Sequence, residues 1–126
     1  MNKEFIPYEQ ALELKELGFD DYNIAWYAIV DEKPKIVFLN YGSHLCAPLY
    51  QQAFRWFREK EYYSDITTEC TQVDSSVGFS WWIWKPWSRS IEERSPEKRG
   101  DEWSYKTYEE AELECLKKLI EIVKNK

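Results

Sequence analysis

The chain has 126 residues, 44% of them hydrophobic, which is enough for one domain that buries a core without metals or disulfides. Its 23 acidic residues outnumber 17 basic ones and give a net charge of −6. This balance argues against nonspecific nucleic-acid binding, which requires clustered lysine and arginine. The first residues lack the apolar core of a signal peptide, and no apolar run approaches the roughly 20 residues of a membrane span, so we expect a cytoplasmic protein.

The first third of the chain predicts a helix, a β-hairpin and a loop. The helix covers 8–17 and ends before Gly18, the residue type best able to take the left-handed conformation after a helix. Two β-rich runs, 24–30 and 35–39, are separated by a polar turn with proline and predict the hairpin. Residues 40–47 predict a loop. The expected core face of the helix comprises Tyr8, Ala11, Leu12 and Leu14.

The middle of the chain predicts a second helix and a second hairpin. Pro48 sits where a helix begins without losing a needed donor, and an aromatic helix is expected from there to about Lys60. Residues 66–73 and 77–84 predict two strands joined by a short turn. The mixed charges of residues 88–102 predict a mobile loop.

The C-terminal segment predicts a helix capped at Thr107. Glu110 follows Thr107 at the capping-box spacing, in which each side chain satisfies a backbone donor of the other residue. Acidic residues precede basic ones, which suits the helix dipole, and Glu114 is expected to pair with Lys118. The apolar face comprises Ala111, Cys115, Leu116, Leu119, Ile120 and Val123, widened by Leu113 and Ile122.

These elements together predict a single α+β domain over residues 1–126. The expected order is αββαββα, with an antiparallel sheet of about four strands and helices on one face, because hairpin-length connections join the strands. No repeat of fixed period and no linker divides the chain.

The second strand of the second hairpin is aromatic on both predicted faces. Alternation places Phe79, Trp81 and Ile83 on one face. Trp82 and Trp84 then lie on the other. Three interpretations stay open: a core on both faces, covered by the charged loop; a surface for a protein partner or a homodimer; and a stacking platform for a nucleotide or sugar. For the last two, the candidate binding residues are Trp82, Trp84, Trp87, Trp26, Arg89 and Arg94.

Catalytic and metal-binding patterns are scarce. His44 is the only histidine, so an enzyme that uses it with a loop acid is a remote alternative. His44 and Cys46 offer two metal ligands where a structural zinc site needs four. Cys46, Cys70 and Cys115 form no C-x-x-C pair, so neither a metal nor a disulfide framework is expected. No glycine-rich phosphate loop is present, and we expect no cofactor.

Residues 47–60 and 105–124, together with the opening Glu-Gln-Ala-Leu-Glu-Leu-Lys-Glu-Leu-Gly-Phe at 9–19, support a resemblance. They resemble the signature helices of a family of short, uncharacterised proteins from gut-bacterial phages and mobile elements. The resemblance implies such an origin and transfers no functional residue. The sequence therefore predicts a small protein that acts by binding, to a protein partner or to itself, with small-ligand binding as the alternative.

Overall fold

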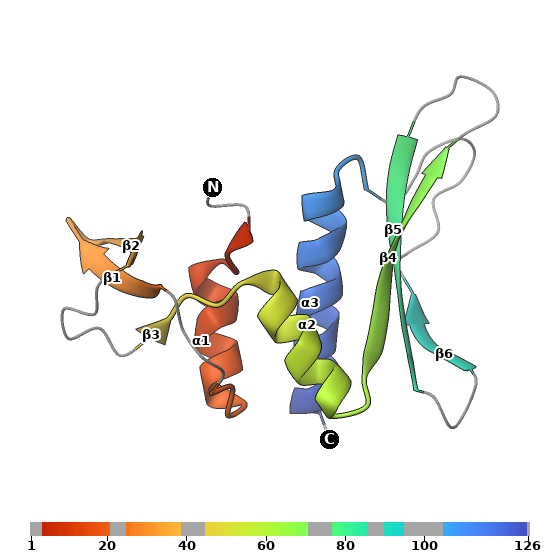
Figure 1. Ribbon diagram of the computed structural model, residues 1–126, viewed down its shortest axis with the longest axis horizontal. Coiled ribbons are helices and arrows are strands. Elements are labelled where there is room, and N and C mark those ends of the chain that lie inside the picture. Colours follow the sequence, from red (N-terminus) through yellow and green to blue (C-terminus); the bar gives the residue numbers. More distant parts are fainter. Residues whose placement is uncertain are drawn as a thin grey trace.

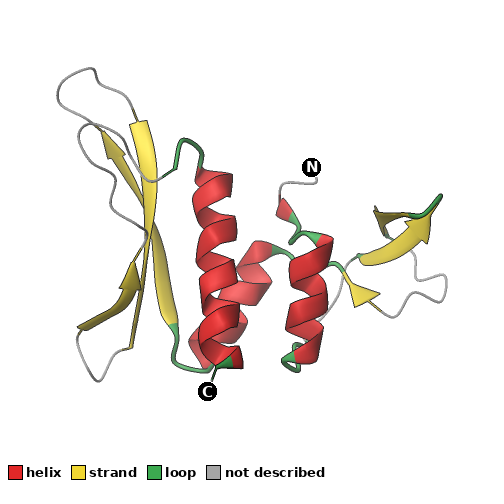
Figure 2. Cartoon of the chain, turned by 180° about the vertical axis from the view of Figure 1, so that it is seen from behind, coloured by secondary structure: helices red, strands yellow, loops and turns green. Residues whose placement is uncertain are grey.

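Three helices lie between two small antiparallel sheets in the computed structural model of the chain, which describes residues 4–20, 25–38, 45–70, 77–85, 90–94 and 105–125 (Figure 1). Figure 2 shows the same three layers from behind. The elements are α1 (Tyr8–Glu16), β1 (Trp26–Val30), β2 (Lys33–Val37), β3 (Leu45–Cys46), α2 (Tyr50–Glu59), β4 (Tyr63–Cys70), β5 (Val77–Lys85), β6 (Ser90–Arg94) and α3 (Tyr108–Lys124). The predicted α+β class is confirmed. Within the described residues, no helix is both long and apolar enough to cross a membrane.

The described strands form two separate sheets of three strands each, where the sequence predicted one sheet of about four. The first sheet has the order β2-β1-β3 and the second β4-β5-β6, and all pairings are antiparallel. Both predicted hairpins are present, but the helices stand between them and prevent them from pairing with each other (Figure 1). Helices cover one face of the second sheet, where α3 contacts β4 and β5, and α2 contacts β4.

Two strands, β3 and β6, occupy segments for which the sequence predicted loops. Leu45 and Cys46 pair with Tyr27 and Trp26 of β1, and two residues are too few to show a period. β6 pairs with β5 across an irregularity next to Ile83, and its composition is polar because it is an edge strand. The loop predictions are therefore wrong at these residues, while 40–44, 88–89 and 95–102 lie outside the described part of the chain.

The β1–β2 hairpin turns through two residues with left-handed backbones. Asp31 has φ 51° and Glu32 has φ 64°, which is the combination of a type I′ turn, whose twist matches that of the flanking strands. Pro34, predicted to lie in the turn, belongs instead to β2 and lies opposite Ile29. A proline is tolerated there because β2 is the edge strand of its sheet.

Helix α3 begins directly after Thr107, as predicted, and the structure shows the Thr107 half of the predicted capping box. Its N-cap is Thr107, whose hydroxyl oxygen accepts a hydrogen bond of 3.2 Å from the backbone N–H of Glu110. The predicted pair of Glu114 with Lys118 is wrong: Glu114 Oε1 lies 3.2 Å from Nζ of Lys117, and Lys118 pairs with Glu121 at 3.4 Å. Residues three apart on a helix are neighbours, as residues four apart are, so Glu114 can pair with Lys117 as readily as with Lys118. The buried residues of α3 are Ala111, Cys115, Leu116, Leu119 and Ile120.

Helix α1 ends at the predicted place, and its expected core face is confirmed except at Leu12. Gly18 has φ +95° directly after the helix, as its position predicts. Ala11 and Leu14 are buried, whereas Leu12 is 40% exposed and Gln10 is buried instead. Leu12 lies two residues, or about 200°, around the helix from Gln10. The buried side of α1 therefore includes a glutamine that the sequence did not predict and excludes the predicted Leu12.

Candidate functional site

Strand β5 places its aromatic residues on two faces, as alternation predicts. Trp81 and Ile83 are buried on the face that meets the helices. Trp81 Nε1 donates a hydrogen bond of 3.4 Å to the hydroxyl of Tyr105. Phe79 is half-buried and makes an edge-on contact with Tyr108, the first residue of α3, at 5.9 Å between ring centroids. One side of the aromatic strand is therefore core.

Trp82 and Trp84 lie on the opposite face of the sheet, and both are half-buried. Trp84 lies opposite Tyr63 of β4, and the two rings stack with centroids 6.1 Å apart and an interplanar angle of 26°. Asp65 lies opposite Trp82 and is exposed. No described helix lies on this side of the sheet (Figure 1). We call Tyr63, Trp82 and Trp84 the outer aromatic face.

The structure divides the binding residues that the sequence proposed. Trp26 lies in β1 of the first sheet, on the other side of the helices from β5, so it is not adjacent to the outer aromatic face (Figure 1). Arg94 belongs to β6 and pairs with Trp82, which brings it to the same sheet. Trp87, Arg89 and His44 lie outside the described residues.

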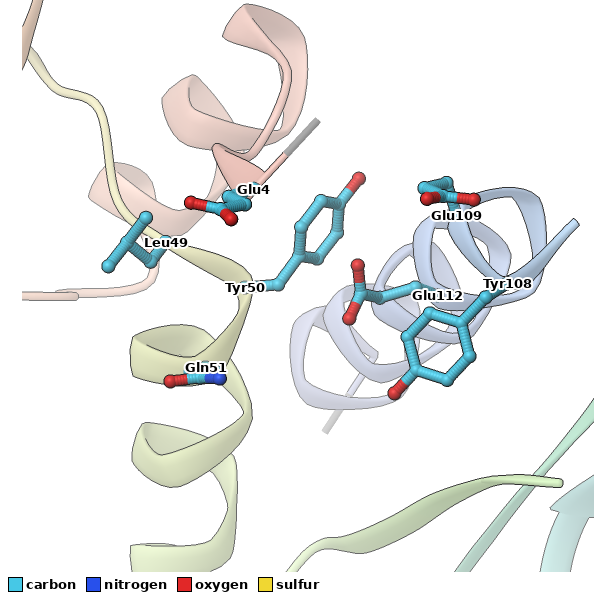
Figure 3. A pocket seen from close by; sticks show the side chains of 7 residues that line it. All are labelled: Glu4, Leu49, Tyr50, Gln51, Tyr108, Glu109 and Glu112. Atoms are coloured by element: carbon cyan, nitrogen blue, oxygen red, sulfur yellow. The ribbon is translucent and has the colours of Figure 1, made fainter. Parts of the chain in front are cut away.

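A second candidate site is a cleft of about 300 Å³ between the beginnings of α2 and α3, which sequence reasoning missed (Figure 3). The N-terminal segment reaches it because the N–H of Ile6 donates a hydrogen bond of 2.8 Å to the carbonyl oxygen of Pro48. Helix α2 is fixed there by Gln52, whose side-chain oxygen accepts from the N–H of Leu49 at 2.9 Å. The cleft is lined by Glu4, Leu49, Tyr50, Gln51, Tyr108, Glu109 and Glu112, and we call it the acidic cleft.

The electrostatics of the acidic cleft centre on Glu112. Burial, and then the nearby charge of Glu109, raise the pKa of Glu112 to about 7. Burial, and then Glu112, also raise the pKa of the phenols of Tyr50 and Tyr108 above the usual 10.0. Near neutral pH the cleft therefore holds two neutral phenols and a carboxyl group that is close to half ionised. Such a group can exchange a proton or attract a cation.

The only sequence signal for this cleft is the spacing of Glu109 and Glu112, which are three residues apart and so lie one turn apart on α3. Helix capping and the dipole already explain an acidic first turn, so the spacing alone does not indicate a site. The sequence around Tyr50 does not indicate a cleft, because an aromatic residue at the start of an amphipathic helix is typical of a core position. Tyr50 is brought next to Glu109 and Glu112 only when the chain folds.

The described part of the chain gives little support for a metal-binding site or for a reactive cysteine. There, no three histidine, cysteine, aspartate or glutamate residues are placed to hold a metal ion. Cys115 is buried on α3, and burial is the main cause that raises the pKa of its thiol to about 12, which makes it unreactive near neutral pH. Comparison with known protein families, with curated proteins and with solved structures finds no match. Function is therefore inferred from the geometry and chemistry of the described residues.

Proposed function

We propose that the protein acts by binding a protein partner through the outer aromatic face. The observation that carries this proposal is the position of Trp82 and Trp84 on the face of the second sheet away from α2 and α3. The inner face, with Trp81 and Ile83, already supplies the packing that those helices need. Tryptophan and tyrosine are the residues that contribute most to binding at protein interfaces, because they bury a large area with little loss of side-chain entropy.

The charge beside this face defines the partner further. Asp65 is exposed on one side of Trp82 and Arg94 of β6 pairs with Trp82 on the other, but the chain as a whole carries a net charge of −6. We therefore infer a partner whose contact surface is apolar with a basic rim, because opposite charges at the rim speed association and reject wrong partners. A second copy of this chain fits less well, since it would bring the same net negative charge to the contact. The resemblance to phage and mobile-element proteins extends the proposal to a host protein as the partner.

The test compares a double variant of the outer aromatic face with a single control variant in one binding assay. In Trp82→Ser/Trp84→Ser the outer aromatic face loses both indoles, while Ile29→Ser removes an apolar side chain that is 60% exposed on the first sheet. Proteins retained by the immobilised chain from bacterial lysate are identified and purified, and each variant is titrated with them by calorimetry. We expect at least a tenfold loss of affinity for the double variant and less than a twofold change for Ile29→Ser.

Folding and self-association are measured alongside the affinity. Circular dichroism must show that the double variant melts cooperatively, because a loss of binding in an unfolded protein carries no information. Equal affinity of the folded double variant and the wild type would refute the outer aromatic face as the contact. A concentration-dependent dimer in light scattering, abolished by the double variant, would make a second copy the occupant instead of a host protein.

A further inference from the structure

We propose that the acidic cleft between the first turns of α2 and α3 binds an organic cation, either a primary ammonium or a guanidinium group. Its three carboxylates come from two segments far apart in the sequence: Glu4 from the N-terminal turn, Glu109 and Glu112 from α3. None of the described residues that line the cleft is basic. The site lies apart from the outer aromatic face and does not depend on its function.

Several acidic side chains of α1 and α3 have a basic partner, whereas the carboxylates of the acidic cleft have none among the described residues. On α1 and α3, acidic side chains form ion pairs: Glu13 with Lys124 at 3.0 Å, Glu114 with Lys117 at 3.2 Å and Glu121 with Lys118 at 3.4 Å. Among the described residues, no lysine or arginine lies within ion-pair distance of Glu4, Glu109 or Glu112. Glu4 and Glu109 are exposed, but Glu112 is half-buried. A half-buried carboxylate without a counter-charge is costly, and an external cation would compensate it.

Tyr50 provides an independent indication of a ligand. The residue is only 6% exposed, yet within the described part of the chain its hydroxyl has no hydrogen-bond partner. Figure 3 shows its ring standing between Glu4 on one side and Glu109 and Glu112 on the other. A phenol hydroxyl accepts a hydrogen bond from an N–H donor, and the face of its ring attracts a cation. Tyr108 contributes a second ring to the same cleft.

The geometry favours an organic cation over a metal ion. In the described residues, no three carboxylates converge closely enough to hold a metal. A guanidinium group carries five N–H donors in a plane, and an ammonium group carries three, so either can reach separated acceptors that a bare ion cannot bridge. The volume of about 300 Å³ is at the lower end for ligand clefts and fits one such headgroup with a short alkyl stem.

Binding should depend on pH through Glu112. Among the described residues, the titratable groups around it are Glu109, Tyr108 and Cys115 on its own helix, Tyr50 of α2 and Glu4 of the N-terminal turn, and none of these is basic. A bound cation favours the ionised form of Glu112, so affinity should rise as the pH increases from 6 to 8.

The test is a titration of the full chain, followed by ¹⁵N–¹H NMR at pH 8, with butylguanidinium, butylammonium and a short peptide of alternating glycine and arginine. We expect saturable shifts at the amides of Tyr50, Tyr108 and Glu112. Glu112→Gln, which keeps the shape of the side chain, should weaken binding at least tenfold and remove the pH dependence. Glu114→Gln, which removes a charge from the same helix outside the cleft, should change the affinity less than twofold.

The arms of this experiment separate the sources of the cation and the ways in which the proposal fails. Tighter binding of the peptide than of butylguanidinium would place the cation on a protein partner, whereas equal binding would indicate a free amine or guanidine. Shifts that do not saturate, or equal weakening by Glu112→Gln and Glu114→Gln, would show only nonspecific attraction and overturn the proposal. Trp82→Ser/Trp84→Ser should leave this binding unchanged, so the two proposed sites can fail separately.

Discussion

The half-buried carboxyl group of Glu112 destabilises the folded chain when it ionises. Its pKa of about 7 lies above the usual 4.5, so between these values the unfolded chain loses a proton that the folded chain retains. The penalty is absent below pH 4.5, grows as the pH rises and is complete above pH 7. After allowance for solvent screening, we expect Glu112→Gln to raise the free energy of unfolding by about 1–2 kcal/mol at pH 8 and very little at pH 4. Urea unfolding at both pH values measures this, and an equal effect at the two would contradict it.

Thr107 shows how a single exposed side chain fixes a helix end. Its hydroxyl accepts from the N–H of Glu110, one of the four amides that the first turn of α3 leaves without a helical partner. We expect Thr107→Ala to lower the free energy of unfolding by about 1 kcal/mol and the thermal midpoint by a few degrees. Thr107→Ser retains the acceptor and is the matched control. A midpoint that stays the same in the alanine variant would show that the cap adds no stability.

At the scale of elements, the apolar face of α3 is the main source of stability in the contact between helices and second sheet. Leu116 and Leu119 are fully buried there. We expect alanine at either position to cost about 2–5 kcal/mol, because the lost transfer energy is joined by the energy of the cavity left behind. Leu12→Ala in α1, where the leucine is 40% exposed, should cost less than about 0.5 kcal/mol. Denaturant titration of the three variants measures these losses in the free energy of unfolding. A similar loss in all three would mean that burial of the leucine does not determine its contribution to stability.

The elements also show which local signals are reliable. The ends of α1 and α3 follow from Gly18 and Thr107, because a helix end is determined by residues within one turn of it. The face of β5 that meets the helices follows from the period of two. β3 and β6 carry no such signal, because each is a strand only through its pairing with β1 or β5. The exposure of Leu12 and the burial of Gln10 in α1 were missed for a similar reason, since neighbouring elements decide which side chains of a helix are buried.

At the scale of the whole molecule, the two sheets are held to the helices to different extents. In the first hairpin, Ile29 is 60% exposed and Val30 38% exposed, while Tyr27 is buried and its hydroxyl donates to the carbonyl oxygen of Ile6. The second sheet packs on two helices. We expect amide hydrogens of β1 and β2 to exchange at least tenfold faster than those of β4 and β5, because local opening of the first hairpin exposes less apolar surface. Hydrogen-exchange mass spectrometry tests this, and equal protection would show that the molecule opens as one unit.

The sequence by itself determined the α+β class, the helix ends, the apolar face of α3 and the two faces of β5. All of these depend on residues within a few positions of each other, so propensity, capping and periodicity are enough to predict them. Only the tertiary structure decided that the strands form two sheets, that Trp26 lies apart from Trp82 and Trp84, and that Glu4, Tyr50 and Glu112 line one cleft. These features depend on the packing of segments distant in the chain, which sets both the spacing of the side chains and the burial that raises the pKa of Glu112.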